Sequence, residues 1–294
     1  MANLLRFLKK CLTDPPAALR SSKLVGRSLY GRWYWHRHPD TPLRYRLPTG
    51  GVLYLEPGHS FTTCFWPDVD GYEPDVRGVL TSLLKPGSVF IDCGANIGYF
   101  SILAAGMVGP SGQVIAIEAN PIAYQRLERN LQANRIGTAV HCALAAQGGE
   151  VQLFMSVKGD VYSSLHTGGL VTGDSIQSFK VAACTLEEVA RKCALSRVDL
   201  VKIDVEGAEL EVLKSSPGFL TSFKPVIVLE YSTLTWPIFG STPEALKELS
   251  RAYRYALRQY DVRQRKLVAV SEEVWRSPYA NLVLVPEETG EHGP

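Results

Sequence analysis

The sequence predicts an α/β fold whose core is a mostly parallel sheet of seven strands. Two observations support this: the candidate strands are short and apolar on both faces, and helical segments separate most of them. Strands of this kind belong to parallel sheets that helices cover on two sides. The predicted strands are 89–92, 112–118, 139–144, 198–204, 225–230, 267–270 and 281–285. Helices are predicted over 97–108, 121–134 and 207–215, and others begin at the capping box Thr185-x-x-Glu188 and at Thr242-Pro243.

A different pattern precedes the first of these strands. Residues 43–47 and 52–56 alternate between apolar and polar around Pro48-Thr-Gly-Gly51, which is typical of a β-hairpin. Tyr72-Glu73-Pro74 then begins a helix that is expected to run to Leu84. We therefore expect an extension over residues 1–42, a main domain over 43–286 and a tail over 287–294.

The extension is basic. Residues 1–46 hold ten Lys and Arg against two Asp, a local charge of +8 in a chain whose net charge is +2. Apolar residues recur at helical spacing from Leu4 to Leu12, and residues 19–35 are rich in Arg, Lys, Tyr and Trp. One interpretation is a helical segment that contacts a membrane surface or a partner through residues 1–35. The other, which the sequence favours, is a cap helix packed on the main domain.

The composition is that of a soluble globular protein, with 46% hydrophobic and 20% charged residues. The six cysteines form no C-x-x-C pair and several lie in apolar runs, which favours buried, reduced thiols over disulfides or a zinc site. No apolar run approaches the ~18 residues of a membrane span, and the first residues are too basic for a secretory signal. We expect a cytoplasmic protein and leave its oligomeric state open.

The turn after the first strand of the sheet is the strongest candidate for a ligand-binding loop. It reads Asp92-Cys93-Gly94-Ala95-Asn96-Ile97-Gly98 and lies where ligands bind in open α/β sheets, beyond the carboxyl end of the strand. A dinucleotide loop needs a second glycine two residues after Gly94, so that the pyrophosphate can approach, and this chain has Asn96 there. Asp92 would repel phosphates but suits an ammonium or a sulfonium. The loop therefore indicates S-adenosyl-L-methionine rather than NAD, with Gly94 and Gly98 allowing close approach or a positive φ.

Further cofactor contacts are expected at the ends of the next two strands. Glu118 ends the second strand, where an acidic residue can accept hydrogen bonds from ribose hydroxyls. Asn120 follows at the entry to the next helix and either touches the cofactor or simply starts that helix. At the end of the third strand, the backbone of Cys142, Ala143 and Leu144 lies near the expected position of an adenine.

Candidate catalytic residues are the acidic side chains after the fourth and fifth strands. Asp204 and Glu206 are two residues apart and so can share a face, and Glu230 ends the fifth strand. A hydroxyl acceptor must lose its proton, for which we expect Asp204 as the base, with Glu206 and Glu230 as reserves. His141 and His166 are weaker candidates, because a single His in an apolar strand is usually a core residue. The three carboxylates could hold a hard metal ion, but their spacing does not require one and we expect none.

These motifs resemble those of the FkbM family of methyltransferases. The similarity rests on Tyr72-Glu73-Pro74 and on the blocks at residues 90–100, 114–121 and 198–209, which follow in order between residues 43 and 285. The resemblance implies a Rossmann-like class I methyltransferase sheet and methyl transfer from S-adenosyl-L-methionine, commonly to a hydroxyl of a natural product, sugar or glycan. It implies that Asp92, Gly94, Ala95, Asn96, Gly98 and Glu118 hold the cofactor, with Glu73 reaching over from the preceding helix. The chain departs from the family at residues 143–147, where relatives often carry an acidic residue.

Other functions stay open at this point. A nucleic-acid methyltransferase would use the basic extension on phosphates, but the chain lacks the Asn-Pro-Pro-Tyr or Asp-Pro-Pro-Tyr block of amino-group methylases, since Asn120-Pro121 leads to Ile122. A non-catalytic module would bind the cofactor without transferring its methyl group, and an NAD oxidoreductase is a more distant alternative. Acceptor choice is expected in the extension and in the Gly/Ser-rich residues 156–178, which are predicted to be a lid or substrate loop or else a plain insertion.

Overall fold

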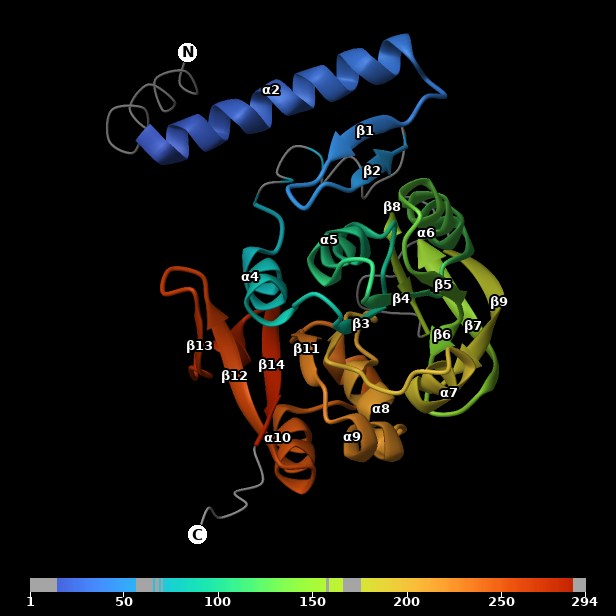
Figure 1. Ribbon diagram of the computed structural model, residues 1–294, viewed down its shortest axis with the longest axis vertical. Helices are drawn as coiled ribbons and strands as arrows, with labels where there is room; N and C mark the ends of the chain where they lie inside the picture. The colour runs from blue at the N-terminus through green and yellow to red at the C-terminus, as the bar shows by residue number, and fades with distance from the viewer. Residues whose placement is uncertain are drawn as a thin grey trace. The chain divides into compact units, whose positions relative to one another are not determined.

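A computed structural model describes residues 15–56, 66, 69, 71–156, 159–165 and 176–287 of the protein; of residues 15–21, 156 and 159–163 it describes the backbone (Figure 1). The chain forms two compact units, one of residues 1–45 and 54–72 and the other of residues 46–53 and 73–294. Among the described residues, no helix has both the length and the apolar character needed to cross a membrane.

The larger unit is built on an eight-stranded sheet of order β13-β12-β14-β11-β10-β3-β4-β5. The five strands from β11 to β5 run parallel, and β14, β12 and β13 pair antiparallel at the other end. Their bounds are β3 (Val89–Cys93), β4 (Gln113–Glu118), β5 (Thr138–His141), β10 (Leu200–Ile203), β11 (Val226–Tyr231), β12 (Tyr255–Asp261), β13 (Lys266–Ala269) and β14 (Ala280–Pro286). This confirms the predicted α/β class. Seven of the eight strands were predicted, and β12 was missed. Most of its residues are half-buried and several are polar, so it does not show the apolar run that marks the neighbouring strands.

Helices surround this sheet (Figure 1). Their bounds are α4 (Pro74–Leu83), α5 (Tyr99–Val108), α6 (Pro121–Asn134), α7 (Leu186–Lys192), α8 (Glu209–Lys214), α9 (Pro217–Phe223) and α10 (Pro243–Ala252), with short 3-10 turns η2 (Trp236–Phe239) and η3 (Val274–Arg276). Helix α5 packs on β3 and β4, α6 on β4 and β5, and α10 on β12. Polar caps define where three of them begin: the side chains of Asn120, Thr185 and Thr242 each accept hydrogen bonds from the first turn of the helix that follows.

The predicted third strand is divided in two. β5 ends at His141, and residues Ala143–Leu144 form β6, which pairs with β9 (Ile176–Cys184) instead of continuing beside β4. β9 also pairs with β7 (Gly149–Ser156), which pairs with β8 (Gly159–Ser164), so a second, four-stranded sheet of order β6-β9-β7-β8 follows the first. The prediction of a loop over 156–178 is therefore wrong at both ends, because β8 and the start of β9 satisfy their backbone groups in this sheet. His166 and residues 168–169 lie outside the described residues.

The smaller unit holds α2 (Pro15–Arg37) and part of the β1 (Leu43–Arg46) and β2 (Val52–Leu55) pair, which confirms the expected helix and hairpin. Trp66 is central to its packing: the indole Nε1 donates to the Arg27 carbonyl over 2.8 Å, and its ring lies 5.9 Å from that of Tyr45. A Cβ at Gly31 would lie 3.0 Å from the Trp66 ring, so the glycine lets the helix approach the indole. The helix predicted over 4–12 lies outside the described residues.

Candidate functional site

The site residues lie where the order of the parallel strands reverses. β3 lies between β4 and β10 in the sheet, and the turns that follow β3 and β10 leave the same edge. These two turns touch: at Gly94, with φ of +75°, a Cβ would lie 1.8 Å from the Asp204 carbonyl oxygen. The close approach predicted at Gly94 is thus made to the end of β10. At Gly98, with φ of +92°, an added Cβ would lie 2.9 Å from the Leu127 side chain. Ligands of open α/β sheets bind at this reversal.

Gly94→Ala is expected to lower both stability and cofactor affinity, because the methyl group must displace the backbone at Asp204. We expect the free energy of unfolding to fall by about 1–3 kcal/mol, the usual cost of local backbone strain. Gly109→Ala is the matched control: Gly109 also has a positive φ, of +64°, but its Cβ would meet nothing within 4 Å. Urea denaturation and S-adenosylhomocysteine titration of both variants separate the effects. Equal losses of affinity in both would show that the contact with Asp204 is unimportant.

Asp92 is buried at the end of β3, with 1% of its surface exposed. Its Oδ2 accepts a hydrogen bond from the Ser101 hydroxyl on α5 over 2.6 Å, whereas its Oδ1 has no partner among the described residues. Burial raises the pKa of Asp92, and the nearby Lys202 ammonium opposes that rise. A buried carboxylate oxygen without a partner is costly and marks a place where a ligand atom or a water would complete the site.

Glu118 ties the loop after β3 to the end of β4. Its Oε2 accepts from the Asn96 amide over 2.7 Å and its Oε1 from the Asn120 amide over 2.8 Å. Burial raises the pKa of Glu118 to about 7, against these backbone hydrogen bonds. The predicted ribose contact is untested, but each carboxylate oxygen has a second lone pair for it. The Asn96 Oδ1 is also buried, and no described residue forms a hydrogen bond with it.

Asn120 and Ala143 have clear structural roles. The Asn120 Oδ1 caps α6 by accepting from the Ile122 and Ala123 amides, and its Nδ2 lies 3.1 Å from the Met155 sulfur. Ala143 is buried in β6, paired with Ala183 of β9. Contact between the cofactor and either residue stays a prediction.

Lys202 is a site residue that the sequence analysis did not single out. It is 3% exposed in β10, and its Nζ donates to Asp204 Oδ2 over 2.8 Å. The ammonium also lies 5.2 Å from the centre of the Phe100 ring. The pKa of Lys202 is raised because the attraction of Asp204, Asp92 and Glu73 outweighs the effect of burial. A lysine inside an otherwise apolar strand was the available signal, because buried lysines are almost always paired.

The three predicted catalytic carboxylates differ in their surroundings. Asp204 forms the salt bridge with Lys202. Burial and the charge of Asp204 raise the pKa of Glu206 well above its ordinary value, and they raise that of Glu230 to about 10. Glu230 therefore holds its proton at neutral pH, and Asp204 is the carboxylate of the three that is held beside a cation.

Glu209, the last acidic residue of the 198–209 block, shapes the turn after β10. Its Oε1 accepts from the Val205 and Gly207 amides and its Oε2 from the Trp236 indole over 2.9 Å. It is fully buried, which raises its pKa to about 7. One oxygen each of Asp204, Glu209 and Glu230 lies within 4.8 Å of the others, a spacing that could hold a metal ion. Asp204 and Glu209 already accept hydrogen bonds, so the geometry does not require a metal, and its absence stays a prediction.

Three predicted site residues have left-handed backbone conformations: Glu73 with φ of 36°, Asn96 with 50° and Glu206 with 56°. Glu73 is the N-cap of α4, and its charge contributes to the raised pKa values of Lys202 and Glu230. Strained backbone of this kind concentrates at functional sites, which supports the grouping of these residues.

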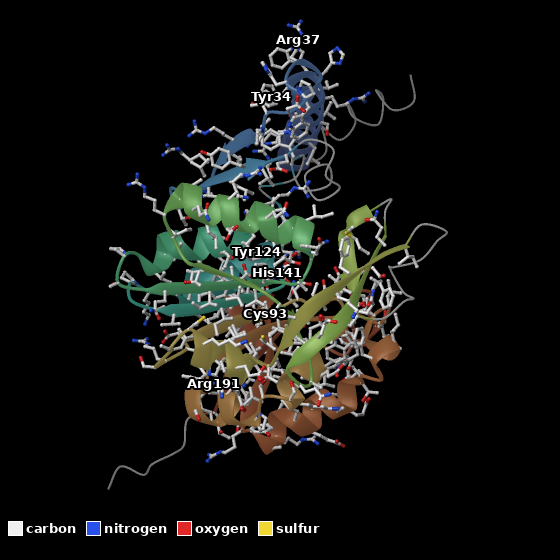
Figure 2. The ribbon with its side chains drawn as sticks, turned by 90° about the vertical axis from the view of Figure 1, so that its right-hand side faces the viewer. Tyr34, Arg37, Cys93, Tyr124, His141 and Arg191 are labelled. Atoms are coloured by element: carbon white, nitrogen blue, oxygen red, sulfur yellow. The ribbon has the colours of Figure 1, made fainter. Side chains whose placement is uncertain are left out.

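His141 lies at the end of the edge strand β5. Its ring stacks on Tyr124 of α6 with centroids 4.5 Å apart, and its Nε2 lies 3.2 Å from the Ala119 carbonyl (Figure 2). These contacts give it a packing role away from β10, but the side chain is exposed, so the expected place in the core is wrong.

Comparison with known proteins identifies the family. The Methyltransferase FkbM domain matches residues 92–257 of the chain, which is more than half of its length. The chain belongs to the FkbM methyltransferase family. The FkbM region includes the loop after β3, Glu118 and the three candidate catalytic carboxylates, whereas Glu73 and α2 precede it.

Three FkbM-type and other methyltransferases are similar to this chain. Methyltransferase sdnD of Sordaria araneosa is 32% identical over 194 residues, which cover 55% of this chain and 73% of that protein. The 31-O-demethyl-FK506 methyltransferase FkbM of Streptomyces tacrolimicus is 28% identical over 44% of this chain and 60% of its own length. Hexuronic acid methyltransferase AglP of Haloferax volcanii is 28% identical over 53% of this chain and 61% of its own length. The chain thus spans about three fifths of the last two relatives.

Proposed function

We propose that the protein transfers the methyl group of S-adenosyl-L-methionine to a hydroxyl of a small molecule, a sugar or a glycan. One observation carries the proposal: a salt bridge holds Asp204 beside Lys202 at the carboxyl end of β10, against the loop that follows Asp92. Family membership supports the methyl transfer, and the ion pair supports a general base for a hydroxyl.

The residues present suit the cofactor. S-adenosyl-L-methionine carries a sulfonium and an ammonium, and the described site is rich in carboxyl groups: Asp92 and Asp204 act on the buried Lys202, Asp92 also acts on Glu118, and Asp204 acts on Glu209. The unpartnered oxygens Asp92 Oδ1 and Asn96 Oδ1 are acceptors that a cationic, hydrogen-bonding ligand would satisfy. Asp92, Asn96 and Glu118 would therefore hold it, with Gly94 and Gly98 shaping the loop.

When bound, the cofactor supplies a methyl group on a good leaving group, so placement accounts for most of the protein's task. The acceptor oxygen forms the new bond to the methyl carbon as the carbon–sulfur bond breaks. In the proposed reaction, Asp204 takes the hydroxyl proton, and the salt bridge with Lys202 holds the Asp204 carboxylate in position. Glu230, whose pKa is raised to about 10, can donate a hydrogen bond to the acceptor.

Two relatives indicate the acceptor class. Their names describe methylation of a demethyl-FK506 oxygen and of a hexuronic acid. We propose a small-molecule or glycan acceptor, rather than a nucleic acid, for this chain as well. The buried free thiols Cys93, Cys142 and Cys184 support the further proposal that it acts in a reducing compartment such as the cytoplasm.

The experiment has two parts. Calorimetric titration should show S-adenosylhomocysteine binding to the wild type, and Asp92→Ala should weaken it by at least about tenfold, equivalent to ~1.4 kcal/mol. Tritiated methyl transfer is then tested on uronic acids, polyketide alcohols, RNA and DNA. Transfer to a hydroxyl compound supports the proposal, and transfer to nucleic acid with steep salt dependence contradicts it. Binding without transfer to any acceptor would favour a non-catalytic module, and binding of NAD alone would exclude the methyltransferase function.

A further inference from the structure

We propose that α2 binds the surface of an anionic lipid bilayer through an apolar stripe bordered by cations. The stripe consists of Val25, Leu29 and Trp33, whose side chains are 59%, 62% and 52% exposed. They recur every four residues and so span about 80° of the helix circumference. The proposal concerns the smaller unit alone and is independent of the methyl-transfer reaction.

The opposite face of α2 already has a partner inside the smaller unit. Gly31 packs against the Trp66 ring, and the Arg27 carbonyl accepts from the Trp66 indole. The apolar stripe is therefore not the side by which the helix joins its own unit. An exposed apolar stripe on a helix packed by its other face indicates a surface for an external partner.

The charges around the stripe identify that partner. By helical position, Arg32 lies on one side of the stripe, and Arg37 and Lys23 lie on the other. All three are exposed, and Figure 2 shows Arg37 at the end of the helix, where its guanidinium lies 6.0 Å from the Trp33 ring. Residues 15–38 contain no acidic residue. A surface without anions suits a negatively charged partner rather than a mixed-charge protein face.

The aromatic residues point to lipid rather than to another anion. Trp33 lies in the stripe and Tyr30, 48% exposed, lies beside it with its ring 5.8 Å from that of Trp33. Trp and Tyr favour the boundary between lipid headgroups and acyl chains, and Lys and Arg beside them pair with anionic headgroups. A nucleic acid would use the cations but would gain nothing from Val25 and Leu29. The aromatic residues and cations of α2 thus support the membrane interpretation of the extension.

The test uses the full chain and vesicles of phosphatidylcholine, with or without phosphatidylglycerol. We expect flotation with the anionic vesicles, at least about tenfold stronger than with neutral ones, and release at high salt. Leu29→Glu should abolish flotation. Val262→Glu is the matched control, because Val262 is a similarly exposed apolar residue, at 46%, in the turn after β12. Arg32→Gln with Arg37→Gln should remove the preference for anionic lipid.

The following outcomes would contradict the proposal. Absence of flotation with anionic vesicles, or equal flotation of Leu29→Glu and wild type, rules out this surface. If the wild type is a dimer by light scattering and Leu29→Glu is a monomer that floats like the wild type, the stripe covers a second copy instead. Circular dichroism and S-adenosylhomocysteine binding, measured on every variant, show whether the variant is folded.

Discussion

Asp204→Asn is expected to lower the kcat of methyl transfer by about 10²- to 10⁴-fold, the usual contribution of a general base. The amide keeps the shape of the carboxylate and can still accept the hydrogen bond that Lys202 donates over 2.8 Å. The hydrogen bond is kept but the charge pair is lost, so the variant should still fold and bind S-adenosylhomocysteine, with a lower free energy of unfolding. The amide cannot take a proton from a hydroxyl, so the loss should fall on kcat. Tritiated methyl transfer at saturating cofactor, with kcat and KM determined separately, is the measurement.

Glu230→Gln and Glu206→Gln are the matched controls. Burial and the charge of Asp204 raise the pKa of Glu230 to about 10 and that of Glu206 well above its ordinary value. Glu230 is therefore already neutral at pH 7, and an amide of the same shape should cost far less there than at Asp204. Because the same causes raise the pKa of Glu206, we expect a similarly small loss in Glu206→Gln. If either variant loses as much kcat as Asp204→Asn, or if Asp204→Asn stays active, the base is another residue.

The fold and the position of the loop after β3 were the predictable part of this protein. Apolar runs locate the parallel strands because those strands are buried on both faces, and Thr185 and Thr242 mark helix starts because their side chains cap free amides. Asp92, Glu118 and Asp204 were found because parallel strands bring their carboxyl ends to one edge. These signals are local, and a single sequence displays them.

The missed features depend on contacts between distant segments. β6 does not continue β5 in the first sheet, because it pairs with β9, which lies some forty residues later in the chain. Glu209 is part of a recognisable motif, but its role could not be predicted. That role depends on hydrogen bonds from the Trp236 indole and from the backbone of the turn after β10. Which carboxyl groups have raised pKa values depends on burial and on neighbouring charges, and both depend on the folded structure.

Lys202→Met is expected to lower the free energy of unfolding by about 3–5 kcal/mol at neutral pH, the usual cost of breaking a buried ion pair. Methionine fills a similar volume, but Asp204 loses its partner, and Asp92 loses the cation that opposes the rise in its pKa. Lys180→Met is the control: its salt bridge with Glu150 has side chains 74% and 61% exposed. That change should stay within about 0.5 kcal/mol.

The pH dependence of Lys202→Met distinguishes lost charge from lost packing. Without the ammonium, the pKa of Asp92 in the folded state rises further above its unfolded value, since burial already raises it. A carboxyl whose folded pKa is raised stabilises the fold below the unfolded pKa, and this contribution is lost as pH rises through the folded pKa. The deficit of Lys202→Met should therefore be larger at pH 8 than at pH 5, and adding Asp92→Asn should reduce it at pH 8. Urea denaturation at both pH values measures this, and a deficit independent of pH would show that Lys202 acts through packing alone.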